Sequence, residues 1–144
     1  MNLSTNFTSD EATHSNYAIS HGIDNSLPAD KLKDSIQFAT NILQPVRDKI
    51  GLVFNISSWY RCSALNTAVG GKDTSAHLSA MAVDFVIAGH TALESYNMVL
   101  VALKDLHIQF DQLIIEKNTK TGANWVHLGV KKFGNRNQSF ALSV

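Results

Sequence analysis

The longest run of regular apolar spacing in the chain extends from about residue 29 to residue 50. Its apolar residues recur at intervals of three and four, the spacing of one helix face. They are Leu32, Ile36, Ala39, Leu43, Val46 and Ile50. Pro45 lies inside this pattern and lacks a backbone N–H, which predicts a kink or an early end near Gln44. Gly51 is a typical C-terminal stop.

Short, partly β-branched apolar runs predict four strands along the rest of the chain. They are Leu52–Ser57, Met81–Ala88, Gln112–Glu116 and Trp125–Val130. A polar hairpin loop, residues 117–124, joins the last two, and Phe140–Leu142 is a candidate edge strand. Residues 61–80 have loop chemistry, with a helical turn expected at residues 64–68.

Two capping boxes mark further helix starts. Thr8 with Glu11 predicts a short helix, and Thr91 with Glu94 predicts a helix that reaches about Leu106. Two main helices and several strands without βαβ regularity indicate an α+β domain.

The length of 144 residues fits one domain, residues 1–144. The first 28 residues are rich in Ser, Thr and Asn, and form an arm that either packs on the domain or extends from it. Apolar residues make up 44% of the chain, which is enough for a hydrophobic core.

Charge and cysteine content narrow the range of functions. Twelve basic residues balance twelve acidic ones, which argues against a nucleic-acid partner and disfavours a metallonuclease. No apolar run approaches the roughly 18–20 residues of a membrane span, so no membrane insertion is expected, and residues 1–6 do not resemble a signal peptide. Cys62, the one cysteine, is expected to be a small buried residue, so any metal must be held by His and carboxylate groups.

Strand alternation places three ionisable residues together. Successive residues of a strand point to opposite faces, so the apolar residues of the strands can share one core face. Asp84, Glu116 and His127 then project from the other face of the same sheet.

His77 is the remaining candidate ligand. It precedes Asp84 by seven residues, so it is expected in the loop before that strand, folded back over the sheet. His77, Asp84 and His127 form either a structural trio or a site for one catalytic zinc ion, with three N/O ligands and an open fourth position. The other histidines are expected at the surface or at helix ends. They are His14, His21, His90 and His107.

Three segments together resemble a known family. Residues 75–84, SAHLSAMAVD, resemble the S-x-H-x-x-G-x-A-x-D motif of the zinc D-alanyl-D-alanine carboxypeptidases, a family that includes L-alanyl-D-glutamate endopeptidases and phage endolysins. Residues 57–61 resemble its S-x-Y-R element, and Trp125-Val126-His127 resembles its closing W-x-H element. The resemblance covers about Phe7 to Gly129, and three motifs in order are more specific than any one of them.

The resemblance implies a Hedgehog/DD-peptidase type fold, α+β with an antiparallel sheet and flanking helices. It implies that the trio binds one Zn²⁺ ion. It also implies that Arg61 binds a substrate carboxylate or stabilises charge near the scissile bond, a role that suits a guanidinium. Ser75, Tyr60 and Trp125 are the other substrate-binding candidates. The alternative for Ser75 is a hydroxyl that supports the metal ligands, and the alternative for the two aromatic residues is a place in the core or the cleft wall.

The chain departs from the family pattern at two positions. The motif glycine is replaced by Ala80, which requires only a slight backbone adjustment. Many members have an acidic base three residues before the last histidine, where this chain has Asn124, which cannot take a proton. Glu116 is the expected catalytic base in its place. The alternatives are Asp111 and a catalytically impaired protein.

The function implied is a zinc peptidase that cuts peptidoglycan stem peptides, as a D,D-carboxypeptidase or an endopeptidase, in phage or prophage lysis of the cell wall. The alternative is a non-catalytic wall-binding or virion structural module on the same fold. Such an enzyme is expected to be a monomer that stays in the host cytoplasm until it reaches the periplasm and wall, or to be virion-associated.

Overall fold

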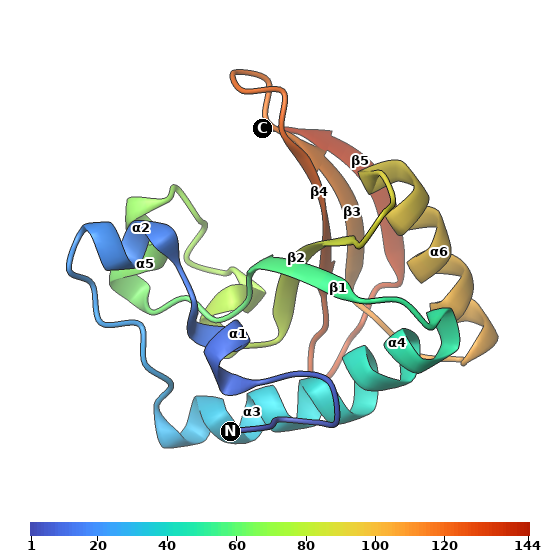
Figure 1. The fold of residues 1–144 in the computed structure, drawn as a ribbon, viewed down its shortest axis with the longest axis horizontal. Coiled ribbons are helices and arrows are strands. Elements are labelled where there is room, and N and C mark those ends of the chain that lie inside the picture. Colours follow the sequence, from blue (N-terminus) through green and yellow to red (C-terminus); the bar gives the residue numbers. More distant parts are fainter.

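The computed structural model describes residues 1–144 and contains one five-stranded sheet with the order β1-β2-β4-β3-β5 (Figure 1). Its strands are β1 (Phe54–Ser58), β2 (Ala82–Ile87), β3 (Gln112–Lys117), β4 (Asn124–Gly129) and β5 (Gln138–Ser143). The four predicted strands and the edge strand are therefore confirmed, as is the α+β class.

The sheet is mixed, which corrects the expectation of an antiparallel sheet. β1, β2, β4 and β3 pair antiparallel in that order, whereas β5 pairs parallel to β3. The reason is that β4 has no free edge to which the next strand could pair. Because β2 and β3 occupy both edges of β4, the chain leaving β4 crosses the end of β3 and adds β5 to the outer edge of β3.

Most of the helices are short. In chain order they are α1 (Ser9–Thr13), α2 (Asn16–Ser20), α3 (Ala29–Phe38), η1 (Ala39–Leu43), α4 (Gln44–Ile50), α5 (Ser63–Ala68), η2 (Ala76–Ser79) and α6 (Ala92–Asp105), and α3 and α6 are the two longest. Both predicted capping boxes are present, at the starts of α1 and α6. No helix combines the length and apolar character that a membrane crossing requires.

Pro45 does not end the long helix. The helix continues from α3 to Ile50, and the irregularity near Gln44 is η1, a π-helical turn that ends at Leu43, two residues before Pro45. Proline removes one i→i−4 hydrogen bond and crowds the carbonyl four residues earlier, and a wider turn accommodates both effects. Gly51 ends the helix in the left-handed conformation, with φ of 76°.

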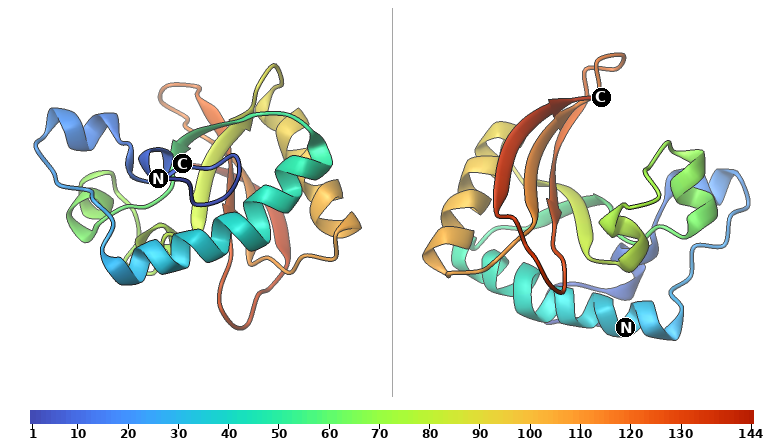
Figure 2. Two further views of the ribbon diagram at one scale, coloured as in Figure 1. Left: turned by 60° about the horizontal axis from the view of Figure 1, so that its bottom comes forward. Right: turned by 180° about the vertical axis from the view of Figure 1, so that it is seen from behind.

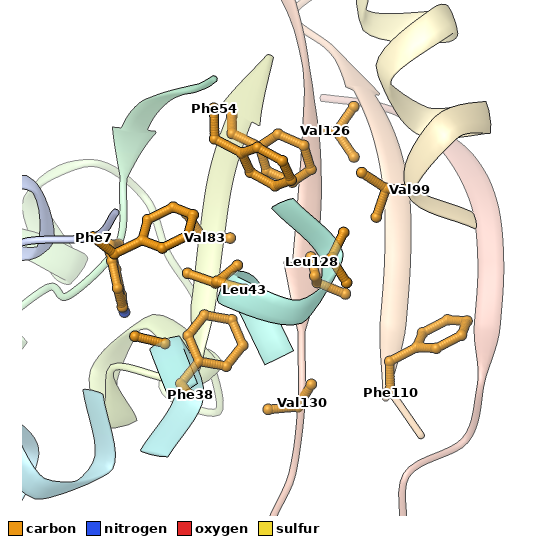
Figure 3. Packing of buried hydrophobic residues seen from close by; sticks show 14 of the residues in the cluster. Phe7, Phe38, Leu43, Phe54, Val83, Val99, Phe110, Val126, Leu128 and Val130 are labelled. Carbon is orange, nitrogen blue, oxygen red and sulfur yellow. The ribbon is translucent and has the colours of Figure 1, made fainter. Parts of the chain in front are cut away.

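The core lies between the long helix, α6 and one face of the sheet (Figure 3). Val83, Phe85 and Ile87 of β2 are completely buried on this face, as are Val126 and Leu128 of β4. The predicted core face is therefore confirmed. α6 and the segment with α5 and η2 lie on opposite sides of the sheet (Figures 1 and 2). The face opposite the core is therefore next to residues 61–80.

Residues of the first 28 pack into this core. The Phe7 ring makes edge-to-face contacts with Phe54 and Trp59, at centroid distances of 5.9 and 6.1 Å. The Asn25 amide donates to the carbonyl of Tyr60 and accepts from the N–H of Cys62 at 3.0 and 2.8 Å. These contacts fix residues 59–62, which connect β1 to α5.

Candidate metal centre

Three side chains meet on the face of the sheet opposite the core. Asp84 of β2 and His127 of β4 are direct partners across the strands, so they share this face as the alternation predicts. Asp84 Oδ1 lies 2.9 Å from His127 Nδ1 and 3.3 Å from His77 Nε2. The ligand atoms of all three residues lie within 4.8 Å of one another.

His77 reaches this face from η2, the 3-10 helix just before β2, which confirms the expectation that it folds back over the sheet. The Ser75 hydroxyl caps the helix by accepting the N–H of His77 at 3.2 Å. Ala80 ends it at φ 58°, a left-handed conformation that glycine adopts more freely than alanine. The motif glycine thus corresponds to a position of real backbone strain.

The main-chain carbonyl of Trp59 determines which nitrogen of His77 faces the site. His77 Nδ1 lies 2.6 Å from this oxygen, so Nδ1 carries the proton and Nε2 is free for the site. The Trp59 indole in turn donates to the carbonyl of Ala80 at 2.8 Å. The sequence contained no signal for this arrangement, because main-chain acceptors do not depend on residue type.

Gly129 leaves room for His127. A Cβ atom at this position would lie 3.1 Å from His127 Nε2 and 3.7 Å from the Cβ atoms of Ala76 and Ala82. Any side chain here would therefore push on the imidazole ring. The orientation of His127 therefore depends on residue 129 having no side chain.

Asp84 remains ionised at neutral pH. Burial alone would raise its pKa, but the two neighbouring imidazole groups, of His77 and His127, outweigh burial and lower the pKa well below the ordinary value. A carboxylate between two imidazoles is a donor set suited to a divalent ion such as zinc.

The guanidinium of Arg61 lies beside the trio. Its Nη2 is 3.6 Å from Asp84 Oδ2, an ion-pair distance that is too long for a hydrogen bond. Nε donates to the Ser58 hydroxyl at 3.2 Å, and Nη1 donates to Asn66 Oδ1 at 3.1 Å. Burial lowers the pKa of Arg61, while the nearby carboxylates of Asp84 and Glu116 raise it in part. A fixed cation therefore stands next to the candidate metal ligands.

Glu116 lies on the same face as the trio, as predicted. Its partner in β4 is Trp125, two residues before His127. Burial raises the pKa of Glu116, and the negative charge of Asp84 adds to the rise. The neighbouring imidazole of His127 opposes this rise in part. The buried indole N–H of Trp125 has no hydrogen-bond partner.

The other two candidates for a base lie in different surroundings. Asp111 accepts hydrogen bonds at 2.9 Å from both Nε and Nη2 of Arg136, and these bonds lower its pKa. Asn124 begins β4 and is exposed. It precedes His127 by three residues, which places it on the opposite face of a regular strand. The geometry brings Glu116, rather than either of these, toward the trio.

Tyr60 is not brought to the trio. Its side chain belongs to the core, and burial is the main cause that raises the pKa of its phenol. Cys62, expected to be buried, is only partly buried, and its Sγ caps α5 by accepting the N–H of Leu65. The four remaining histidines lie outside the trio.

A family model described as Peptidase M15 matches residues 5–128, which include all of the candidate site and exclude β5. A search of curated proteins found no match.

Proposed function

The chain belongs to the peptidase M15 family, and on that premise we propose that it is a zinc-dependent peptidase that cuts peptidoglycan stem peptides. The proposal extends to one zinc ion per monomer, D,D-carboxypeptidase or endopeptidase activity, and a role in phage or prophage lysis of the cell wall. The observation that carries it is the convergence of a His–Asp–His set and a half-buried glutamate on one face of the sheet, opposite the core.

The three candidate ligands fit a zinc ion. His77 would contribute Nε2, Asp84 a carboxylate oxygen and His127 Nδ1, which leaves a position for substrate or water. When bound, zinc would supply Lewis-acid chemistry, which acidifies water and polarises a carbonyl group.

Glu116 is the proposed general base. It accepts a proton from the attacking water while the water oxygen forms a bond to the peptide carbonyl carbon. It then returns the proton to the leaving amine as the C–N bond breaks. Its raised pKa supports this role, because a base works best when its pKa is near the working pH.

Arg61 is the proposed electrostatic partner of the substrate. Only Nε and Nη1 of its guanidinium are hydrogen-bonded to the protein, so further N–H groups are available to a carboxylate or to the developing oxyanion. The unpartnered N–H of Trp125 is a second donor on this face. Ser75 acts through its cap on the helix of His77.

The test is digestion of purified peptidoglycan, with mass spectrometry of the released muropeptides. We expect loss of a terminal D-alanine, or cleavage within the stem, that stops with a chelator and returns with zinc. The Asp84→Asn variant serves as the inactive control. Bound zinc without hydrolysis would overturn the peptidase proposal in favour of the non-catalytic wall-binding module, which the asparagine at position 124 favours.

A further inference from the structure

Asn66 of α5 is buried, with 2% of its surface exposed, and it stands behind the guanidinium of Arg61. Its Oδ1 accepts a hydrogen bond from Arg61 Nη1 at 3.1 Å, and its Nδ2 donates to the carbonyl of Lys72 at 2.9 Å. The two contacts determine how the amide is oriented. If the amide were flipped, its NH₂ group would face the N–H donor of Arg61 and its oxygen would face the carbonyl oxygen of Lys72, so both hydrogen bonds would be lost.

The main chain around Asn66 is also tied down. Its N–H donates to the carbonyl of Cys62 at 2.9 Å, and its carbonyl accepts the N–H of Gly71 at 2.8 Å. The side chain that meets Arg61 therefore has little freedom to move. The fixed Asn66 amide can therefore restrict the position of the Arg61 guanidinium.

Gly71 makes the contact between the two side chains possible. A Cβ atom at Gly71 would lie 2.6 Å from Asn66 Cγ and 2.9 Å from Arg61 Nη1, and closer still to Asn66 Oδ1. Both neighbours are packed, so a methyl group here would displace the amide, the guanidinium or both. Gly70, the preceding residue, has no atom within 4 Å of such a Cβ.

The contact with Asn66 also affects how close the Arg61 guanidinium can come to Asp84. Arg61 Nη2 is 3.6 Å from Asp84 Oδ2, and a guanidinium released on its other side could close on this carboxylate as a two-pronged ion pair. In such a pair the charge of Arg61 would be neutralised by Asp84, a candidate metal ligand, and would no longer be available to the substrate. Asn66 is a neutral acceptor, so it holds Arg61 without neutralising its charge.

We propose that Asn66 is a positioning residue that holds Arg61 back from Asp84 and keeps its charge available to the substrate carboxylate or oxyanion, in a space that Gly71 leaves open. This inference rests on the proposed peptidase function for its catalytic meaning. The contacts among Arg61, Asn66 and Gly71 hold independently of that function.

The kinetic test is a double-mutant cycle on stem-peptide hydrolysis. We expect Asn66→Ala to lower kcat/KM about tenfold or more, which is typical of a lost hydrogen bond to a charged group. In an Arg61→Ala background the same change should have little further effect, because Asn66 acts through Arg61. Equal effects in both backgrounds would overturn the proposal, since a general folding defect would act without Arg61.

A glycine pair supplies a matched control in case Asn66→Ala folds poorly. Gly71→Ala should lower kcat/KM like Asn66→Ala, at unchanged zinc content. Gly70→Ala strains the same loop at φ 80° but touches neither side chain, so it should leave kcat/KM within about twofold while lowering Tm. Equal losses of kcat/KM in both variants would refute the assigned role of Gly71.

A readout without catalysis separates the two proposals. In ¹⁵N NMR spectra, the Nη–H signals of Arg61 should be resolved and slow to exchange in the wild type, because Nη1 donates to Asn66, and they should be broadened in Asn66→Ala and Gly71→Ala. If the wild type cuts no peptidoglycan but the signals behave in this way, the peptidase function fails and the positioning stands. Unchanged Arg61 signals in both variants would overturn the positioning itself.

Discussion

Replacement of Glu116 by glutamine removes the proposed base with almost no change in shape. Glu116 lies opposite Trp125, and His127 is two residues farther along the same strand. This diagonal relation separates the two backbones by about 7–8 Å, a gap that a glutamate side chain and one water molecule can span. The carboxylate can therefore reach a water molecule at the trio without being a ligand.

The expected loss of activity is large and selective. General-base catalysis contributes about 10²- to 10⁴-fold, so Glu116→Gln should lower kcat by at least about 100-fold. Zinc content should stay at one ion per chain, because glutamine leaves the trio intact. Folding stability at neutral pH should rise slightly, because burial disfavours the ionised form of Glu116.

The assay combines stem-peptide turnover, zinc content and thermal unfolding for Glu116→Gln and the control Asp111→Asn. The control should keep its activity and lose stability, since Asp111 is hydrogen-bonded to Arg136 rather than directed toward the trio. More than a tenth of wild-type activity in Glu116→Gln would refute the reasoning. Loss of turnover in Asp111→Asn alone would transfer the role of base to Asp111.

Three further outcomes are expected. Zinc at about 100 times its Kd should stabilise the metal-free chain by ~2.7 kcal/mol, roughly 8 °C in Tm at this size, and an unchanged melting curve would contradict the site. In the metal-free protein, the stability advantage of Glu116→Gln over wild type in urea unfolding should be absent below pH 4 and grow as pH rises through the raised pKa of Glu116; an advantage independent of pH would contradict the burial of this carboxyl. Gly129→Ala should weaken zinc binding about tenfold in a competition titration by displacing His127, and unchanged affinity would show that the ring does not depend on this space.

The face that carries the site was predictable because strand alternation is a local property. Asp84, Glu116 and His127 each lie within an apolar run whose period determines their side of the sheet. Their convergence then required only that the strands be neighbours, and the order β2-β4-β3 makes them so. The fourth residue of the site, His77, was identified from the motif that surrounds it.

Features that depend on pairing between distant segments could not be predicted in this way. The parallel addition of β5 follows from which strand edges remain free, and no residue of Gln138–Ser143 encodes that choice. The hold of Asn66 on Arg61 was missed because residues 61–80 have no periodicity to interpret. α2 was missed for a related reason, since five residues are too few for an apolar stripe.

The segment from Trp59 to Cys62 ties the first residues of the chain to the candidate metal centre. One side of it is hydrogen-bonded to Ala12 and Asn25, and the other to His77. Local unfolding proceeds in contiguous cooperative units, and such hydrogen bonds place both ends of this bridge in one unit. The arm and the site should therefore open together and share one level of amide protection, so that an ion held at the site would also slow fraying at the N-terminus.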